Sequence, residues 1–233
     1  MAPPARTCLI TGANRGIGLE LARQSAAAGA KVIATCRDPA NAEALQELAK
    51  KPGSTLEIYR LDVGLAESVG ALSRQLGDTP IDMLINNAGI MGADPQTSLT
   101  MDFDTMGDVL NVNLIGALRV TQAFMTNVEA AKGKIAVISS MMAQYDFTGT
   151  SKLAYCVSKT AATRAFNMLA GDIRSKGVTI CILSPGWVKT DMGGVGAPVT
   201  AETSARGLLQ QIDKWALKDS GDFRNFEGRE LAW

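Results

Sequence analysis

The sequence predicts an α/β fold in which helices cover both faces of a doubly wound, mainly parallel sheet of about seven strands. Short apolar segments alternate with longer segments of helical pattern along the chain, and polar or glycine-containing clusters follow the ends of the apolar segments. No linker rich in Pro, Gly or Ser and no internal repeat divides the 233 residues. We therefore expect a single domain over residues 1–233.

The predicted elements follow one another in repeated strand–helix units. Strands are predicted at residues 6–10, 31–36, 56–61, 81–86, 134–139 and 178–183, and residues 223–233 are expected to add a short edge strand. Helices are predicted from about 18 to 28, then at 41–50, 65–76, 103–131 and 154–176. Gly29 suits a C-terminal cap, and Asp38 before Pro39 suits an N-cap. Such units imply right-handed crossovers.

The pattern becomes irregular after Pro185. Gly193, Gly194, Gly196 and Pro198 indicate a mobile segment. We expect a substrate loop or lid at about residues 190–206, with the loop 144–153 bordering the same pocket. Trp187 is either a wall of this pocket or a packing residue.

Composition and charge exclude several classes of function. Lys+Arg and Asp+Glu number 23 each, without long runs of one sign, so neither nucleic acid nor an anionic membrane is expected as a partner. No apolar stretch reaches 18 residues and no signal peptide is evident, which predicts a cytoplasmic protein. The four cysteines are scattered and there is no histidine, so no metal site is expected.

The first strand leads into a glycine-rich turn, Thr11 to Gly18, and then into a helix. This order is typical of a Rossmann-type dinucleotide site, in which glycines allow close approach of a pyrophosphate and the helix N-terminus offers unpaired N–H groups. The spacing is T-G-x-x-x-G-x-G rather than G-x-G-x-x-G. The residues expected to contact the dinucleotide here are Gly12, Asn14, Arg15, Gly16, Ile17 and Gly18. A P-loop is excluded because Gly-Lys-Ser/Thr is missing.

Proton transfer must rely on a residue other than histidine. Tyr155 precedes Lys159 by four residues in a predicted helix, which places both side chains on one face. A phenol titrates near pH ~10, and an adjacent ammonium favours the phenolate. The spacing therefore predicts a tyrosine that exchanges protons near neutral pH, although such a pair by itself is also common on helix surfaces.

Jointly, these motifs resemble the short-chain dehydrogenase/reductase family over essentially the whole chain. The similarity depends on Thr11–Gly18, Asp62-Val63, Asn86–Gly89, Asn111–Asn113 with Gly116, Ser139-Ser140, Tyr155 with Lys159, and Pro185–Thr190. Within the family, the segment 185–192 and the short length resemble the C-factor and sniffer-type carbonyl reductases.

The resemblance implies a catalytic set. Tyr155 would be the general acid/base, and Lys159 would lower its pKa and hold the nicotinamide ribose. Ser140 would donate to the substrate carbonyl oxygen; because the Ser140–Tyr155 separation of 15 is two longer than is usual in the family, Ser139 stays the alternative. Asn113 would hold a water linked to Lys159, with a helix kink or a side-chain bond to the backbone as the alternative.

The resemblance also implies further coenzyme contacts. Asp62 and Val63 would contact adenine. Asn86 and Gly89 would lie near the adenosine side of the coenzyme, and Val188 and Thr190 near its carboxamide and phosphates. Further contacts with the coenzyme would come from Ala88, Pro185 and Gly186.

The choice between NADP(H) and NAD(H) depends on the residues after the second strand. Asp38 is a candidate for an NAD ribose hydroxyl. Arg37 and Arg15 instead offer two guanidiniums to a 2′-phosphate, which predicts NADP(H).

The sequence thus predicts an NADP(H)-dependent oxidoreductase that reduces a small-molecule ketone or aldehyde to an alcohol. The alternative is an NADP(H)-binding signalling protein with little turnover. The resemblance implies a homodimer or homotetramer formed through residues 103–131 and 154–176.

Overall fold

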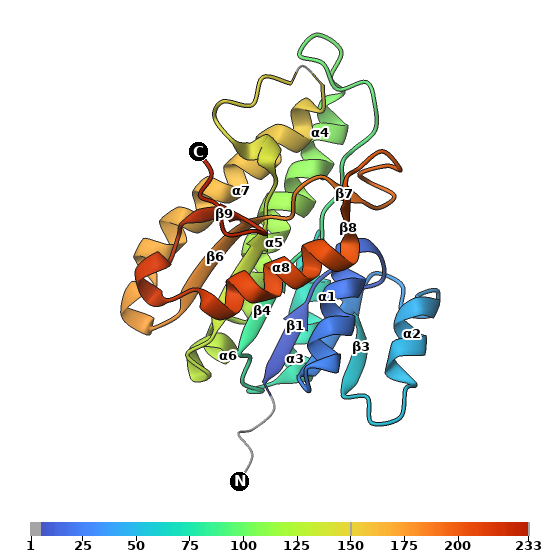
Figure 1. Cartoon of the computed structure of the whole chain (residues 1–233), viewed down its shortest axis with the longest axis vertical. Coiled ribbons are helices and arrows are strands. Elements are labelled where there is room, and N and C mark those ends of the chain that lie inside the picture. Colours follow the sequence, from blue (N-terminus) through green and yellow to red (C-terminus); the bar gives the residue numbers. More distant parts are fainter. Residues whose placement is uncertain (1–5, 150, 233) are drawn as a thin grey trace.

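The computed structural model describes residues 6–149 and 151–232, and its centre is a parallel sheet of seven strands (Figure 1). The strand order is β3-β2-β1-β4-β5-β6-β9, which confirms the predicted doubly wound fold. The strands are β1 (Thr7–Ile10), β2 (Lys31–Cys36), β3 (Leu56–Arg60), β4 (Met83–Asn86), β5 (Lys134–Ile138), β6 (Thr179–Ser184) and β9 (Phe223–Asn225). The chain order reverses between β1 and β4, and in doubly wound sheets the ligand crevice lies beyond the carboxyl ends of the strands at such a point.

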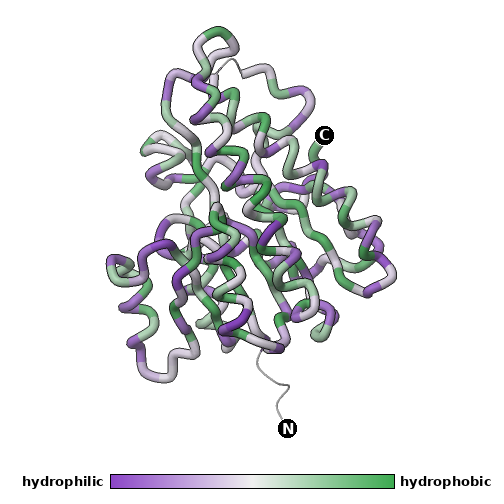
Figure 2. The backbone as a smooth tube through the Cα atoms, turned by 180° about the vertical axis from the view of Figure 1, so that it is seen from behind, coloured by the Kyte–Doolittle hydropathy of each residue, from purple (hydrophilic) through white to green (hydrophobic). Residues whose placement is uncertain are grey.

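Helices form one layer on each face of the sheet. The layer drawn in front in Figure 1 holds α1 (Gly16–Ala27), α2 (Glu43–Ala49) and α8 (Ala201–Lys214). The layer behind holds α3 (Ala66–Leu76), α5 (Ala117–Ala123), α6 (Met125–Ala130) and α7 (Leu153–Asp172). Figure 2 shows hydrophobic stretches along the strands and alternating hydropathy along the helices. This is the pattern of a sheet buried on both faces.

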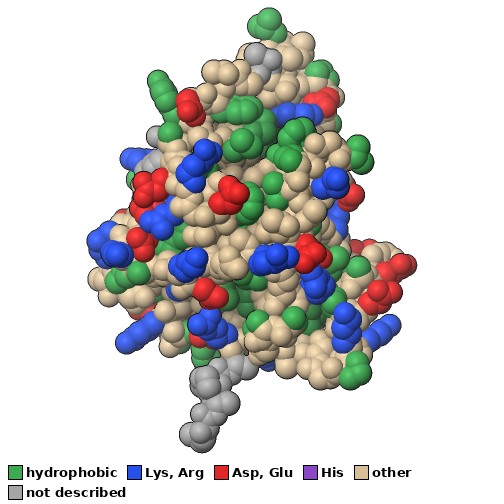
Figure 3. All heavy atoms as spheres, in the orientation of Figure 1, with side chains coloured by type: hydrophobic (Ala, Val, Ile, Leu, Met, Phe, Trp, Pro, Cys, Tyr) green, Lys and Arg blue, Asp and Glu red, His purple; other side chains and the backbone are tan. Residues whose placement is uncertain are grey.

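Two hydrophobic clusters lie on opposite sides of the sheet. In β1, Leu9 contributes to the cluster under α3, α5 and α7, while Cys8 and Ile10 contribute to the cluster under α1 and α8. The alternation follows from the two-residue period of a strand, and it explains why the strand sequences are apolar almost throughout. On the face drawn in Figure 3, Lys and Arg are interspersed with Asp and Glu, as the balanced charge leads one to expect.

The predicted long helical region over 103–131 is helical over almost all of its length, but it is not one regular α-helix. The structure divides it into α4 (Phe103–Leu110), a π-helical stretch η1 (Asn111–Gly116), α5 and α6, with a break at Phe124, where φ is −110° and ψ is 10°. The predicted helix 154–176 likewise ends at Asp172 and continues as a short 3₁₀ turn, η3 (Arg174–Lys176). Helical periodicity continues across both changes, so the pattern alone did not reveal them.

The predicted cap of the second helix is also wrong. The N-cap of α2 is Ala42, and the helix begins at Glu43. The Asp38 carboxylate accepts from Nδ2 of Asn41 at 2.6 Å. Asp38 therefore stabilises the turn before α2, which is what a short acidic side chain often does near a proline.

The segment predicted as a loop over 190–206 is partly regular. Two short strands, β7 (Val188–Lys189) and β8 (Val199–Thr200), pair with each other, and Thr200 caps α8 by accepting from the backbone N–H of Thr203 at 3.1 Å. The excursion between these strands covers residues 190–198, which we call the 190–198 loop. Two further 3₁₀ turns are η2 (Met141–Ala143) and η4 (Leu217–Asp219).

Neither a spanning helix nor a metal-binding cluster is found within residues 6–149 and 151–232. No described helix is both long and apolar enough to cross a membrane. No group of three or more Cys, Asp or Glu side chains in these ranges could hold a metal ion.

Candidate active site

The glycine-rich turn joins β1 to α1 and lies directly against the loop after β4. Gly12 and Gly16 have φ values of +65° and +54°, a conformation that favours glycine. A Cβ at Gly12 would lie 2.9 Å from the Cα of Ala88, and one at Gly18 would lie 2.1 Å from the Gly12 carbonyl oxygen. The close approach of these backbone segments therefore requires glycine at positions 12 and 18.

Two polar residues hold this turn in place. Nδ2 of Asn87 donates to the carbonyl oxygens of Thr11 and Gly12, at 3.0 Å each. Oγ1 of Thr11 accepts from the backbone N–H groups of Asn87 and Ala88, also at 3.0 Å each. Asn87 and Thr11 were not among the predicted site residues. Their positions directly after β4 and β1 were the available signal, because polar side chains at the carboxyl edge of a sheet meet there.

The N-terminus of α1 is suited to an anion. Its N-cap residue, Arg15, makes no side-chain capping bond, and the first turn carries no acidic residue. Unpaired N–H groups and the positive end of the helix dipole therefore face the crevice. Arg37 is exposed just after β2 and makes no ion pair with another described residue. Arg15 forms an ion pair with Asp191, with 3.0 Å between Nη1 and Oδ2.

Tyr155 lies in the first turn of α7 and is 8% exposed. Burial raises its pKa, and the nearby hydroxyl of Ser140, two residues after β5, lowers it by less, so that the pKa remains above its ordinary value. Ser139 instead shares a 2.6 Å hydrogen bond with Oγ1 of Thr163. The structure thus brings Ser140, and not Ser139, to the tyrosine hydroxyl.

Lys159 is buried one turn further along α7. Its Nζ lies 5.7 Å from the centroid of the Tyr155 ring and donates to the carbonyl oxygen of Ile138 at 2.7 Å. Burial lowers the pKa of Lys159 to about 8. The raised pKa of Tyr155 is opposite in direction to the one expected from the Tyr–Lys spacing. The reason is that desolvation disfavours the charged form of both groups.

Asn113 lies in the π-helical stretch η1 and connects three elements. Its Oδ1 accepts from the backbone N–H of Ile90 at 2.8 Å, and its Nδ2 donates to the Ile90 carbonyl and to Oγ of Ser158, both at 2.9 Å. A Cβ at Gly89 would lie 3.2 Å from Oδ1 of Asn113 and 3.5 Å from Nζ of Lys159. The side-chain bond to backbone that was the alternative for Asn113 is therefore present, next to Lys159.

The remaining predicted residues lie around the same crevice. Oδ1 of Asp62 accepts from the backbone N–H of Gly64 at 2.9 Å, and Val63 is buried beside it. Nδ2 of Asn86 donates to Oγ1 of Thr121 at 3.0 Å, but its buried Oδ1 has no partner among the described residues. Ile17 is partly buried and Asn14 is exposed in the glycine turn.

The segment after β6 closes the other side of the crevice. Pro185 is buried, and its carbonyl oxygen accepts from Oγ of Ser204 at 2.8 Å. Gly186 has a φ of +81° where the chain turns toward β7, in which Val188 is buried. Cγ2 of Thr190 would lie 3.2 Å from a Cβ at Gly16, so this segment lies over the glycine turn.

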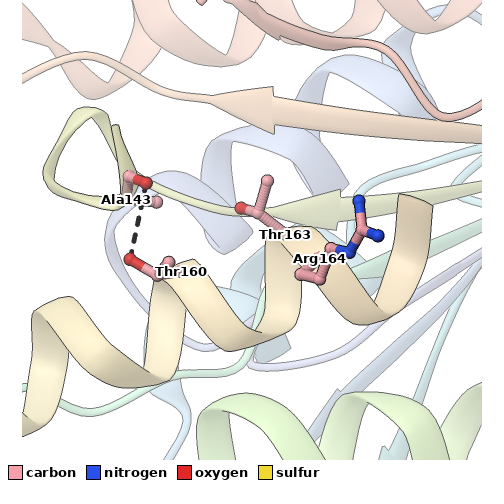
Figure 4. A pocket seen from close by; sticks show the side chains of 4 residues that line it. All are labelled: Ala143, Thr160, Thr163 and Arg164. Carbon is pink, nitrogen blue, oxygen red and sulfur yellow. Dashed lines mark hydrogen bonds between the residues drawn. The ribbon is translucent and has the colours of Figure 1, made fainter. Parts of the chain in front are cut away.

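Two hollows lie along α7, apart from this crevice. Ala143, Thr160, Thr163 and Arg164 line a cavity of about 450 Å³, and Oγ1 of Thr160 donates to the Ala143 carbonyl there at 3.4 Å (Figure 4). A second cavity of about 400 Å³ includes Gln144, Phe147 and Cys156 among its lining residues. None of the predicted catalytic residues lines either hollow.

The crevice itself fits a nicotinamide dinucleotide. It combines a glycine turn with no room for side chains, an uncapped helix N-terminus, a buried lysine and the unpartnered Oδ1 of Asn86. Phosphates, ribose hydroxyls and amide groups are the partners that such a donor and acceptor set can satisfy.

Comparisons with known proteins agree with this geometry. The family model of the short chain dehydrogenases matches residues 6–197. C-signal of Myxococcus xanthus is 36% identical over 156 residues, which cover 66% of this chain and 93% of that protein. The structure of NADPH bound carbonyl reductase from chicken fatty liver has a TM-score of 0.91 and 35% identity, covering 98% of this chain and 99% of that one. Carbonyl reductase Sniffer of D. melanogaster has a TM-score of 0.91 and 29% identity, covering 98% and 100%.

The matched region spans the glycine turn, Ser140, Tyr155 and Lys159, and the structural similarity extends over nearly the whole chain. The predicted resemblance is therefore confirmed. The chain belongs to the short-chain dehydrogenase/reductase family of oxidoreductases and, within it, is similar to the sniffer-type carbonyl reductases.

Proposed function

We propose that this protein catalyses the reversible reduction of a small-molecule ketone or aldehyde to an alcohol with NADP(H). The observation that carries the proposal is the buried Tyr155, close enough to Ser140 for that hydroxyl to lower its pKa and one helical turn from Lys159, at the carboxyl edge of the sheet beside the glycine turn. Proton donor, oxyanion donor and cation lie together where a dinucleotide would bind.

The residues divide the chemistry between them. NADPH, when bound, supplies the hydride that the carbonyl carbon accepts. Ser140 donates a hydrogen bond to the carbonyl oxygen, on which negative charge develops, and Tyr155 protonates that oxygen. Because its pKa is raised, Tyr155 is protonated at neutral pH, which suits the reductive direction. Asn113 holds the loop after β4 next to Lys159.

The coenzyme contacts we propose are those predicted from the sequence. The glycine turn and the N-terminus of α1 would hold the pyrophosphate, Lys159 the nicotinamide ribose, and Asp62 with Val63 the adenine. Val188 and Thr190 would border the carboxamide and phosphates, and the 190–198 loop would border the substrate.

NADP(H) is proposed over NAD(H) because two guanidiniums lie near the ends of β1 and β2. Arg37 is exposed there, whereas the Asp38 carboxylate is engaged by Asn41. We expect kcat/KM for NADPH to exceed that for NADH, and Arg37→Ala to lose mainly this preference. Equal use of both coenzymes by the parent protein would contradict the assignment.

The catalytic proposal is tested by Tyr155→Phe. This variant should reduce turnover by about 10²–10⁴-fold while NADPH binding, followed by fluorescence, persists. The matched control is Tyr59→Phe, which removes a hydroxyl that is bonded to Glu57 within β3, outside the proposed site, and should leave turnover unchanged. Substantial activity in Tyr155→Phe would contradict the role of the phenol.

A second pair of variants separates the two serines. Ser140→Ala should reduce kcat by about 10²–10³-fold, because a donor to the developing oxyanion is lost. Ser139→Ala should retain turnover, since its hydroxyl is bonded to Thr163. The reverse result would assign the oxyanion role to Ser139.

The similarity to C-signal supports one alternative, an NADP(H)-binding signalling protein with little turnover. One measurement distinguishes this signalling function from the proposed reductase activity. Failure to oxidise NADPH with a broad panel of ketones and aldehydes, together with normal NADPH binding, would favour the signalling function.

A further inference from the structure

One ion pair joins the glycine turn to the 190–198 loop. Nη1 of Arg15 lies 3.0 Å from Oδ2 of Asp191, and the two residues are 176 positions apart in the sequence. The side chains are 65% and 78% exposed, so the pair lies at the rim of the crevice in contact with water. Asp191 was not among the predicted site residues.

The position of Asp191 is set by the fold of its own loop. Thr190 accepts from the backbone N–H of Gly193 with its Oγ1 at 3.1 Å and from that of Gly194 with its carbonyl oxygen at 2.8 Å. A Cβ at Gly193 would lie 2.0 Å from the carbonyl oxygen of Val188, so the loop also turns back on β7. These contacts fix the start of the loop over Gly16 and direct the Asp191 carboxylate to the neighbouring guanidinium.

Other carboxylates close to this edge of the sheet are engaged elsewhere. Asp38, after β2, accepts from Asn41, and Asp62, after β3, accepts from the backbone N–H of Gly64. Within residues 6–149 and 151–232, Asp191 is thus the carboxylate that neutralises Arg15.

We propose that Asp191 is a specificity-determining residue, whose carboxylate competes with the 2′-phosphate of NADPH for the Arg15 guanidinium. The inference depends on the proposed function, because it requires a coenzyme bound at the glycine turn. NADH has no 2′-phosphate and does not take part in the competition. Asp191 therefore lowers the affinity for NADPH without lowering that for NADH. It thereby reduces the preference for NADPH over NADH.

The physical basis is an exchange of partners on one cation. A phosphate carries more charge than a carboxylate and offers more acceptor oxygens, so it can displace Asp191. The apparent affinity for NADPH equals the intrinsic affinity multiplied by the fraction of molecules in which Arg15 is not paired with Asp191. Because exposed ion pairs are weak, the reduction should be about two- to five-fold.

The experiment measures dissociation constants in the absence of substrate. NADPH and NADH are followed by fluorescence, and adenosine 2′,5′-bisphosphate by calorimetry, for the parent protein and Asp191→Asn. We expect Asp191→Asn to bind NADPH and the bisphosphate about two- to five-fold more tightly and to bind NADH unchanged. The matched control is Asp213→Asn, which removes an exposed carboxylate paired with Arg6 before β1, at the opposite edge of the sheet.

A double-mutant cycle with Arg15→Ala separates competition from a general change in charge. In the Arg15→Ala background, Asp191→Asn should no longer alter NADPH affinity. The inference is overturned if the effect persists there, if NADH tightens equally, or if NADPH binds unchanged or more weakly in Asp191→Asn. A parent protein that binds neither coenzyme would instead refute the proposed function itself.

Discussion

Burial sets the protonation of both Tyr155 and Lys159. The tyrosine remains a phenol at neutral pH because its charged form would be desolvated, and the lysine pKa is lowered to about 8 for the same reason. The lysine nitrogen is bound to the Ile138 carbonyl, a neutral acceptor. A buried cation without a carboxylate partner is costly, and a protein retains such a group where it has a function.

The lysine makes stability depend on pH. Its pKa in the folded protein, about 8, is below the ordinary value of 10.5. Between these values the unfolded chain binds more protons, so this contribution to the free energy of unfolding increases with pH and is lost as the pH falls through 8. From pH 7 to 9.5 it should increase by about 2 kcal/mol.

Lys159→Met removes this contribution. We expect the free energy of unfolding of the parent protein minus that of Lys159→Met, measured by urea denaturation, to increase over this pH range. Taking the difference cancels the contributions of the buried cysteines, whose raised pKa values act in the opposite direction. A difference that does not change with pH would show that Lys159 is solvated in solution.

At the scale of elements, the catalytic helix α7 is positioned by the loop after β4. Gln96 in that loop is 2% exposed. Its Oε1 accepts from the backbone N–H of Ala154 at 3.2 Å, and its carbonyl oxygen accepts from that of Leu153 at 3.1 Å. Gln96 thus satisfies two of the unpaired N–H groups at the start of α7, immediately before Tyr155.

Gln96→Ala should therefore be costly. It leaves the buried N–H of Ala154 and the Met91 carbonyl without their side-chain partner. We expect the free energy of unfolding to fall by about 1–3 kcal/mol in urea denaturation. Thr97→Ala, which removes an exposed hydroxyl bonded to Thr100, is the control and should stay within about 0.5 kcal/mol of the parent. Equal stability of the two variants would show that the helix start does not depend on Gln96.

At the scale of the whole molecule, one sheet connects two hydrophobic clusters. Phe166 in α7 and Leu208 in α8 are both fully buried, on opposite faces of the sheet. Because each cluster is built on the same strands, neither layer can lose its packing without exposing the sheet. This arrangement favours unfolding of the chain as one unit.

Substitutions on the two faces test this expectation. Phe166→Ala should cost about 3–5 kcal/mol and Leu208→Ala about 2–5 kcal/mol. In each variant, the unfolding transitions followed by tryptophan fluorescence and by far-ultraviolet circular dichroism should shift together. Transitions that separate in one variant would indicate two layers that unfold independently.

The sequence by itself determined the fold class and most of the candidate site. Alternating apolar and helical segments predicted the parallel sheet, and glycines or polar residues after strand ends predicted its binding edge. These features are local, because strand periodicity, turn glycines and the four-residue spacing of Tyr155 and Lys159 each depend on neighbouring residues.

Only the tertiary structure decided which residues contact one another and how much water reaches them. It placed Ser140 rather than Ser139 beside Tyr155, showed the π-helical stretch around Asn113, and raised the pKa of Tyr155. It also brought Asp191 to Arg15 across 176 residues of sequence. Such contacts and desolvation arise when distant segments pack together, and residue spacing carries no direct record of that packing.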